Sequence, residues 1–405
     1  MTAPAHELNR FLASAKPSAT YGVMDRVAAR RARGADVISL SAGEPDFNTP
    51  AHVREAGVAA IRVGHTRYTQ VAGLRALREA VADKFHRENG LEVDWRQTIV
   101  CNGGKQVIFN AIASTLNEGD EVIIPAPYWV SYPEIVQVCG GKPVVVECGV
   151  KSGFKLTPEL LEAAITPRTR WLILNSPSNP TGAVYSRVEL QALAEVLLSH
   201  PHVMVLSDDI YEHLIFDDLK FFTIAQVAPR LRDRVLTMNG VSKAYAMTGW
   251  RIGFGTGPAW LIDAMEKLQG QQTSGASSIS QYAALAALTG PQDFIRESRS
   301  AFQRRRDYLV EQLNTTKGLR CEMPQGAFYA FTSCDELIGK VTPAGQRLAS
   351  DEDVVNALLD DAGIATVHGS AFGLGPYIRI AYALEDSALQ QACEAIRRFC
   401  ETLSS

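Results

Sequence analysis

Seven short runs of apolar, largely β-branched residues alternate with segments of helical periodicity. The runs lie at 98–101, 121–125, 143–147, 171–175, 203–207, 234–238 and 251–254. Continuous apolar strands separated by helices predict an α/β fold with a mainly parallel seven-stranded sheet, covered by helices on both faces. Ligands bind such sheets beyond the carboxyl ends of the strands. We therefore expect the functional residues directly after these runs.

The rest of the chain predicts a second, smaller α+β unit. After a helical stretch at about 280–313, strand-like runs at 327–331 and 377–381 precede a closing helix at 387–402. The N-terminal arm and an extended segment are expected to join this unit in space. A chain of 405 residues is too long to fold around one small hydrophobic core. We therefore expect a large domain of residues 46–290 and a small domain of residues 1–45 and 291–405.

Composition favours a small-molecule partner. Forty basic against 44 acidic residues give a net charge of -4, which argues against nucleic acid or an anionic membrane as the main partner. Seven scattered cysteines without a C-x-x-C pair are typical of reduced thiols in a cytoplasmic enzyme. The N-terminus lacks an apolar signal region, and no apolar run is long enough to span a bilayer. The eight histidines show no ligand spacing, so we expect no metal site.

One lysine, Lys243, follows the sixth apolar run in the stretch T-M-N-G-V-S-K-A-Y-A-M-T-G-W-R. A lysine amine in a closed pocket condenses with carbonyl groups, and Arg251 offers a fork for a phosphate or carboxylate. We hypothesise that Lys243 carries pyridoxal 5′-phosphate as a Schiff base. From this stretch alone, a solvated lysine beside a structural arginine fits equally well.

Two motifs after earlier runs suit the same cofactor. Asn102-Gly103-Gly104-Lys105 lies between a strand and a helix, where backbone N–H groups and the helix dipole attract a phosphate. A tight turn that needs glycine only for its dihedral angles is the alternative. Trp129, in P-Y-W-V-S-Y, is a candidate stacking platform for a flat ring, although tryptophan is more often a core residue.

Three further motifs carry polar groups that suit a pyridine ring and a carboxylate. Asp208 ends a predicted strand, and its carboxylate needs a cationic partner such as a protonated ring nitrogen; a helix N-cap is the alternative. Tyr211 and Asn179 can donate to the ring oxygen, although an asparagine before proline is usually a turn residue. The planar fork of Arg379 suits a substrate carboxylate, with a structural ion pair as the rival interpretation.

A nicotinamide-binding fingerprint is the main competing motif. Gly253, Gly255 and Gly257 have a suggestive spacing, but Pro258 follows at once and no acidic residue stands at the expected distance. We therefore discount a nicotinamide-dependent dehydrogenase.

Taken in order, these motifs resemble those of the pyridoxal-phosphate-dependent aminotransferases of classes I and II, which have fold type I, and in particular the bacterial aspartate aminotransferase branch. The resemblance extends from Lys16 to the final helix. It rests on S-A-G-E-P-D-F, N-G-G-K-Q, P-A-P-Y-W-V-S-Y-P-E, N-S-P-S-N-P-T-G, S-D-D-I-Y-E-H-L, N-G-V-S-K-A-Y-A-M-T-G-W-R-I-G and Q-G-A-F-Y.

The resemblance implies a role for each candidate residue. Lys243 would bind the cofactor and move a proton between the substrate Cα and the cofactor. The implied cofactor contacts are Asp208 on the ring nitrogen, Tyr211 and Asn179 on the ring oxygen, Trp129 on the ring face, and Gly103, Gly104, Lys105 and Arg251 on the phosphate. The implied ligands of the substrate α-carboxylate are Gly43, Asn179 and Arg379. Tyr68 would reach the phosphate from a neighbouring subunit, which implies a homodimer.

Two departures from the family pattern affect these expectations. Many relatives have a phosphate-binding serine where this chain has Gly240; Ser242 is the hydroxyl closest in sequence and is kept as an expected cofactor ligand. Residues 271–278 lack the arginine with which animal-type enzymes bind the distal carboxylate of aspartate. Lys105, helped by Thr20, is the implied substitute in the bacterial branch, and the same pair occurs in relatives that transaminate prephenate.

The leading hypothesis is therefore a ping-pong transamination between L-aspartate or glutamate and 2-oxoglutarate or oxaloacetate. Prephenate or aromatic aminotransferases, lyases and decarboxylases remain alternatives on the same scaffold, because neither fold nor cofactor fixes the reaction. A non-catalytic regulator that binds the cofactor would need a DNA-binding extension, for which we expect no room before Lys16.

Overall fold

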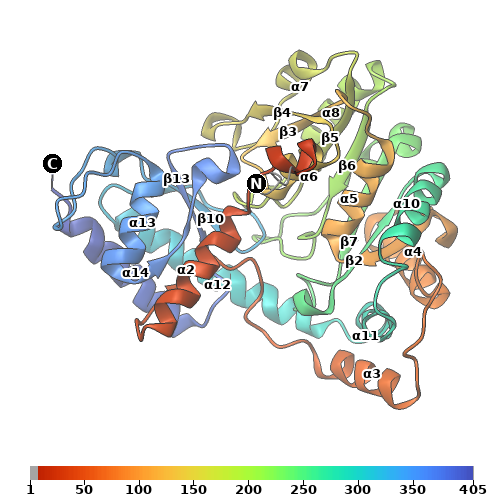
Figure 1. Cartoon of the computed structure of the whole chain (residues 1–405), viewed down its shortest axis with the longest axis horizontal. Coiled ribbons are helices and arrows are strands. Elements are labelled where there is room, and N and C mark those ends of the chain that lie inside the picture. Colours follow the sequence, from red (N-terminus) through yellow and green to blue (C-terminus); the bar gives the residue numbers. More distant parts are fainter. Residues whose placement is uncertain (1–7, 405) are drawn as a thin grey trace, which may run out of the picture.

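The computed structural model describes residues 8–404, and a mixed sheet of seven strands forms its largest layer (Figure 1). The strand order is β2-β8-β7-β6-β5-β3-β4. The strands are β2 (Thr98–Asn102), β3 (Glu121–Ala126), β4 (Lys142–Glu147), β5 (Thr169–Asn175), β6 (Met204–Asp208), β7 (Val235–Gly240) and β8 (Ile252–Thr256). Only β8 pairs antiparallel with its neighbours, β2 and β7. The predicted mainly parallel sheet is thus confirmed.

Helices cover both faces of this sheet, which is why its central strands are mostly apolar, whereas the edge strand β4 is partly exposed. One face packs against α5 (Gly104–Thr115), α6 (Ser131–Val138) and α10 (Ala259–Gln272). The other face packs against α3 (Ala51–Arg62), α4 (Arg75–Asn89), α7 (Pro158–Ala164), α8 (Arg187–Ser199), α9 (Ile224–Val227) and α11 (Ser278–Thr289). Local sequence fixes some helix starts: at α8 Ser186 and Glu189 form a capping box. The sheet is therefore a buried layer, and its strand ends are its accessible parts.

A four-stranded antiparallel sheet of order β12-β13-β10-β9 forms the second unit, which lies on the left of Figure 1. Its elements are α12 (Asp293–Thr315), β9 (Arg320–Cys321), β10 (Tyr329–Ser333), α13 (Asp351–Ala362), β11 (Ile364–Ala365), β12 (Val367–His368), β13 (Tyr377–Ala381) and α14 (Asp386–Thr402). The N-terminal part contributes α1 (Arg10–Ser14), α2 (Ala19–Ala32) and β1 (Ile38–Ser39). The N-terminal strand β1 pairs in parallel with β11.

Two predicted elements differ in their bounds. The helical stretch expected at 280–313 is two helices, because α11 ends at Thr289 and the following Gly290-Pro291 step cannot continue it. The strand expected at 327–331 begins at Tyr329, because Ala327 has a φ of 60°, outside the extended region. Short 3₁₀ helices occupy Trp95–Gln97, Val150–Ser152, Pro229–Arg234, Thr248–Trp250, Asp335–Leu337 and Gly369–Phe372.

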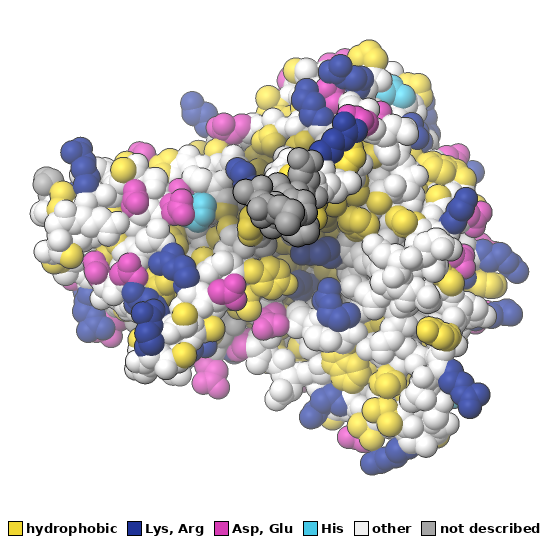
Figure 2. Space-filling view, viewed as in Figure 1, with side chains coloured by type: hydrophobic (Ala, Val, Ile, Leu, Met, Phe, Trp, Pro, Cys, Tyr) yellow, Lys and Arg dark blue, Asp and Glu magenta, His cyan; other side chains and the backbone are white. Residues whose placement is uncertain are grey.

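No helix within residues 8–404 combines the length and apolar character needed to cross a membrane. The surface is hollowed between the two units, and Lys and Arg side chains lie in this hollow (Figure 2). The hollow lies beyond the carboxyl ends of β5, β6 and β7, where ligands of α/β sheets bind.

Candidate active site

A cavity of about 270 Å³ opens at the carboxyl edge of the large sheet. Its wall also includes residues of α2, of the segment that follows β1, and of the paired strands β10 and β13. Twelve of the sequence-predicted residues line it: Thr20, Gly43, Gly104, Lys105, Trp129, Asn179, Asp208, Tyr211, Ser242, Lys243, Arg251 and Arg379. Segments distant in sequence therefore converge on one site.

Two predicted residues do not line this cavity. Gly103 is the N-cap of α5 and directly precedes Gly104, which lines the cavity. Tyr68 exposes 92% of its surface and lies outside the cavity of its own chain. Since Tyr68 was expected to act on a neighbouring subunit, its role stays a prediction.

Lys243 follows β7 by three residues, and its amine faces the cavity. Nζ donates a hydrogen bond of 2.5 Å to the carbonyl oxygen of Gly43. Burial lowers the pKa of Lys243 to about 8, although the carboxylate of Glu44 acts in the opposite direction. A larger fraction of this amine is therefore neutral and nucleophilic near pH 7 than for an exposed lysine.

Asp208, the last residue of β6, is buried at the base of the cavity. Its carboxylate accepts hydrogen bonds from Tyr132 Oη at 2.6 Å and from the backbone N–H of Ile210 at 3.3 Å. Burial raises the pKa of Asp208 to about 6, although the bond from Tyr132 opposes this shift. Both donors are neutral, so the ionised carboxylate is available to a cationic ligand.

Tyr132 is a site residue that the sequence prediction missed. It belongs to the same P-Y-W-V-S-Y motif as Trp129 and lies on α6, three residues further along. This spacing places both aromatic rings on one side of the chain, where they meet edge to face with centroids 5.3 Å apart. The spacing was a usable signal for Tyr132.

Tyr211 and Tyr329 share a hydrogen bond of 2.8 Å between their hydroxyl groups, and both side chains are buried. Burial raises the pKa of Tyr211 well above its usual range, so its phenol stays protonated and can donate to an anionic oxygen. Tyr329 was also missed, although it ends the Q-G-A-F-Y motif. Its proximity to Tyr211 depends on how β10 meets the large sheet, which the sequence does not reveal.

Arg379 lies on β13, opposite Phe331 of β10, and is buried. Its Nη1 donates to Asn179 Oδ1 at 3.1 Å and its Nη2 to the carbonyl oxygen of Ser41 at 2.6 Å. The guanidinium also lies over the ring of Tyr329, 4.7 Å from its centroid. These contacts fix the planar fork, and Nε is buried without a hydrogen-bond partner within residues 8–404. The arrangement suits a carboxylate ligand.

The first turn of α5 and Arg251 form a cradle for an anion. Gly103 has a φ of 83° at the N-cap, and Gly104 and Lys105, the first two residues of α5, line the cavity. The first N–H groups of a helix have no partner within the helix, so they are available to an anion. Arg251 has a φ of 58°, and its Nη1 donates to the carbonyl oxygen of Thr248 at 2.9 Å. A Cβ at Gly253 would lie 2.2 Å from the backbone nitrogen of Gly104, so only glycine lets β8 approach this turn.

The close approach of β7 and β8 explains the departure at Gly240. A Cβ there would lie 3.0 Å from the carbonyl oxygen of Ile252 and 3.1 Å from Cα of Gly253. A serine would therefore require the strands to shift. Gly255 similarly packs on Val107: a Cβ at Gly255 would lie 3.0 Å from Cγ1 of Val107. The glycines of β8 serve close packing, consistent with discounting a nicotinamide fingerprint.

Lys105 and Thr20 lie on different elements, α5 and α2, but line the same cavity. Lys105 Nζ lies 4.9 Å from the ring centroid of Trp129. Partial burial and the nearby charge of Arg251 lower the pKa of Lys105. Besides Lys243 and Arg251, the cavity thus contains the basic side chains of Lys105, on α5, and Arg379, on β13.

The cavity fits pyridoxal 5′-phosphate in three respects. The glycine cradle beside Arg251 suits the phosphate, Asp208 suits a protonated ring nitrogen, and Lys243 offers an amine for the aldehyde. These groups come from α5, β6, β8 and the loop after β7, so the fold itself brings them together.

Comparisons with known proteins agree with this geometry. The family model for aminotransferase class I and II matches residues 35–396. The chain is 57% identical over 394 residues to a probable aspartate/prephenate aminotransferase of Rhizobium leguminosarum bv. phaseoli, with 96% of this chain and 98% of that protein covered. It is 55% identical over 397 residues to the aspartate/prephenate aminotransferase of Cereibacter sphaeroides, with 98% and 99% covered.

Solved structures lead to the same family. The aspartate aminotransferase of Rhizobium meliloti superposes with a TM-score of 0.96 at 52% identity, with 99% of this chain and 100% of that chain covered. The Thermus thermophilus aspartate aminotransferase with maleate gives a TM-score of 0.91 at 42% identity, with 97% and 100% covered. This chain therefore belongs to the class I and II aminotransferases, fold type I enzymes that transfer amino groups with pyridoxal 5′-phosphate.

Proposed function

We propose that this enzyme transfers the amino group between L-aspartate and 2-oxoglutarate, in two half-reactions of a ping-pong cycle. The observation that carries this proposal is the pair of cations, Arg379 and Lys105, on different walls of the cavity that Lys243 enters. These two cations match the two carboxylates of a dicarboxylic substrate. The aspartate aminotransferase relatives support the same substrate.

The cofactor is proposed to be held by the residues that fit it. Asp208 binds the ring nitrogen, Tyr211 and Asn179 the ring oxygen, and Trp129 the ring face. The phosphate ligands are the first turn of α5, with Gly103, Gly104 and Lys105 contributing backbone N–H groups, together with Ser242 and Arg251. When bound, the cofactor supplies an electron sink for the electrons of the substrate Cα–H bond.

The chain's own residues then perform the binding and proton-transfer steps. Arg379, with Asn179 and the backbone of Gly43, holds the substrate α-carboxylate and fixes the orientation of Cα. As a neutral amine, Lys243 would take the proton from the substrate Cα and pass it to the cofactor, a role that its lowered pKa supports. The surrounding Tyr211, Tyr329 and Arg379 are buried, so this transfer takes place away from bulk water.

Prephenate is proposed as a second amino acceptor. It is a 2-oxo acid with a further carboxylate, and therefore presents the same two anionic groups to Arg379 and Lys105. Thr20 lines the cavity near its α2 wall and can donate a hydrogen bond to the second carboxylate. The two relatives whose names include prephenate support this choice.

The active form is proposed to be a homodimer in which Tyr68 reaches the phosphate site of its partner; its 92% exposure in one chain supports this role. The division into residues 46–290 and residues 1–45 with 291–405 is likewise a proposal, supported by the separation of the seven-stranded sheet from the four-stranded sheet and the β1–β11 pair. We propose a cytoplasmic location, since all seven cysteines are free thiols, as is usual in that compartment.

A donor and acceptor panel tests the function. With 2-oxoglutarate as acceptor, we expect the highest kcat/KM for L-aspartate among aspartate, phenylalanine and tyrosine, and initial-rate plots with parallel lines. Prephenate should accept an amino group from glutamate or aspartate. Preference for phenylalanine would identify an aromatic aminotransferase, and cofactor binding without turnover would favour a regulator. Lys243→Ala is the control, and it should lose both turnover and the visible absorption of the bound cofactor.

A further inference from the structure

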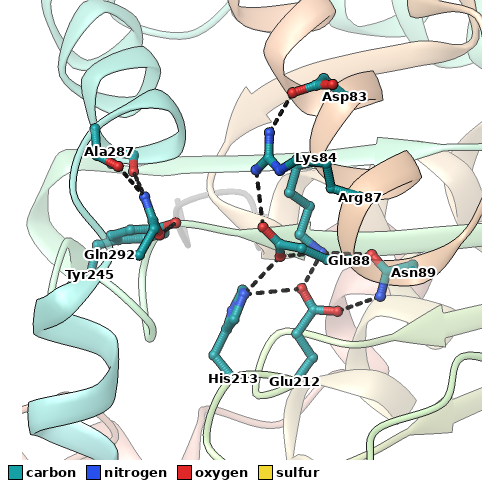
Figure 3. Close-up of polar contacts among 11 residues, drawn as sticks. Asp83, Lys84, Arg87, Glu88, Asn89, Glu212, His213, Tyr245, Ala287 and Gln292 are labelled. Atoms are coloured by element: carbon teal, nitrogen blue, oxygen red, sulfur yellow. Dashed lines mark hydrogen bonds and ion pairs between the residues drawn. The ribbon is translucent and has the colours of Figure 1, made fainter.

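A partly buried cluster of polar residues includes Glu212 and His213, the two residues that follow Tyr211 in the chain (Figure 3). This cluster, called the Lys84 cluster, consists of Lys84, Glu88 and Asn89 of α4 and of Glu212 and His213. Lys84 is 1% exposed and contacts Glu212 Oε1 directly, and its Nζ donates to Asn89 Oδ1 at 2.7 Å. Asn89 Nδ2 donates in turn to Glu212 Oε2 at 2.7 Å. Both carboxylate oxygens of Glu212 are therefore held by α4.

The loop connects this cluster to the cavity through adjacent residues. Glu212 directly follows Tyr211, which lines the cavity, while Glu212 contacts α4 on the opposite side of the loop. The backbone turns tightly here: the N–H of Glu212 donates to the carbonyl oxygen of Asp209 at 2.9 Å, and that of Leu214 to Tyr211 at 2.8 Å. Because the turn is tight, the position of Glu212 constrains where the phenol of Tyr211 lies.

His213 extends the cluster toward the lysine loop. Its Nε2 lies 2.9 Å from Glu88 Oε2, and its ring meets the ring of Tyr245 at a centroid distance of 6.5 Å. Tyr245 lies two residues after Lys243, and its hydroxyl donates to Gln292 Oε1 at 2.8 Å. The cluster therefore touches both loops that carry residues of the proposed active site.

A metal ion is the obvious alternative occupant, because ligand atoms of Glu88, Glu212 and His213 lie within 4.8 Å of one another. The ammonium group of Lys84 already contacts Glu212 and lies 3.5 Å from Glu88. Although burial opposes it, the hydrogen bond from His213 and the charge of Lys84 lower the pKa of Glu88 to about 2. The cluster thus carries its own cation, and it fits a structural tether better than a metal site.

We propose that Lys84 and Glu212 are positioning residues for catalysis: through Glu212 they fix the loop that presents Tyr211 to the ring oxygen of the cofactor. This inference rests on the proposed role of Tyr211 in cofactor binding. A donor on that oxygen stabilises its negative charge and thereby lowers the affinity of the cofactor-linked lysine nitrogen for a proton. Displacing Tyr211 therefore raises the pH at which that proton leaves.

The test compares Glu212→Gln with a matched control, Glu121→Gln. Glu121 is also buried at 2% exposure, accepts bonds from Thr166, Arg168 and Lys142, and lies at the opposite edge of the sheet, at the amino end of β3. For each holoenzyme we would measure the melting temperature, the cofactor dissociation constant, and the pH midpoint of the visible absorption change. Tyr211→Phe gives the reference shift for complete loss of the donor.

Both glutamate variants are expected to melt at lower temperature, but only Glu212→Gln should raise the spectral midpoint, by about one pH unit, a tenfold change in proton affinity. Asn89→Ala is the milder second variant, because it removes a neutral contact to Glu212, and it should shift the midpoint in the same direction. If neither Glu212→Gln nor Asn89→Ala shifts the midpoint more than Glu121→Gln does, the positioning role is wrong while the proposed function stands. If the wild-type protein shows no visible absorption with pyridoxal 5′-phosphate, the proposed function fails, and this inference with it.

Discussion

The hydroxyl group of Tyr132 donates a hydrogen bond of 2.6 Å to the carboxylate of Asp208, at the buried end of β6. This bond stabilises the ionised carboxylate and holds down a pKa that burial raises to about 6. Without this hydrogen bond, burial would raise the pKa of Asp208 further. The protonation state of Asp208, and with it the capacity to bind a cationic ring, thus depends on a residue of another element, α6.

Tyr132→Phe should therefore raise the pKa of Asp208. Because the ionised carboxylate binds the cofactor, affinity for pyridoxal 5′-phosphate is lost as pH falls through that pKa, and in the variant this loss should begin about one pH unit higher. Cofactor dissociation constants measured from pH 5 to 8 check this shift. Tyr185→Phe is the control, because Tyr185 is a buried tyrosine whose hydroxyl bonds the backbone of Leu156. An unchanged profile in Tyr132→Phe would contradict the role of the bond.

The pKa of Lys243 gives a second prediction. Burial lowers this pKa to about 8, and only the neutral amine attacks the aldehyde of the cofactor. The rate at which cofactor-free protein captures pyridoxal 5′-phosphate should therefore rise with pH and level off above a midpoint near 8. Stopped-flow absorbance measures this rate, with Lys243→Ala as the control that captures none. A midpoint near the usual value for an exposed lysine would show that the cavity leaves the amine unperturbed.

Much of the fold could be predicted from the sequence, because the signals were local. Each apolar run between 98 and 254 became a strand of the large sheet, and the parallel sheet placed the residues after the runs on one edge. For this reason eight of the twelve predicted residues that line the cavity follow these runs, whereas Thr20, Gly43, Arg251 and Arg379 reach it from other segments. The helical stretch expected at about 280–313 is divided into α11 and α12 at the Gly290-Pro291 step, a break that the sequence analysis did not place.

Tyr132 could have been found from its spacing to Trp129, but the other missed residues share a physical cause. Tyr329 reaches Tyr211 only because β10 and the large sheet meet across the cavity, a contact between segments 118 positions apart. The Lys84–Glu212 pair likewise joins α4 to the loop after β6 across 128 positions. No local pattern encodes such contacts. The tight packing at Gly240 could not be predicted from the sequence either, because it depends on the distance between β7 and β8.

Arg379→Lys should impair all amino acid substrates to a similar extent. Lysine cannot reproduce the fixed fork that Asn179 and Ser41 hold, and the α-carboxylate is common to every substrate. We expect kcat/KM to fall roughly 10- to 100-fold for aspartate and phenylalanine alike. Arg234→Lys is a matched control, since Arg234 bonds backbone carbonyl groups far from the cavity. A loss confined to aspartate would assign Arg379 to the distal carboxylate instead.

Lys105→Met should separate substrates by their second carboxylate. The methionine keeps much of the contact with Trp129 but removes the charge, while the backbone N–H of residue 105 remains for the phosphate. The KM for aspartate should rise roughly tenfold or more, and the KM for phenylalanine should change by less than about twofold. Prephenate should behave like aspartate. Equal changes for aspartate and phenylalanine would remove Lys105 from substrate selection.

Gly253→Ala should displace the first turn of α5, which forms part of the phosphate cradle. A Cβ at Gly253 would lie 2.2 Å from the backbone nitrogen of Gly104 and 2.4 Å from the carbonyl carbon of Gly103, so the first turn of α5 must move. Backbone atoms cannot change rotamer to relieve this overlap, and overpacking of this kind costs about 1–3 kcal/mol of stability. The displaced N–H groups should weaken pyridoxal 5′-phosphate binding by roughly tenfold or more.

The matched control for this prediction is Gly249→Ala, because no atom lies within 4 Å of a Cβ at Gly249. Binding of pyridoxal, which has no phosphate, separates the two possible causes of weaker binding. If the cradle alone is displaced, Gly253→Ala weakens pyridoxal 5′-phosphate binding much more than pyridoxal binding. Equal weakening of both ligands would show that the substitution disturbs the ring site through β8, and would remove the close packing of Gly253 and Gly104 as the specific basis of phosphate binding.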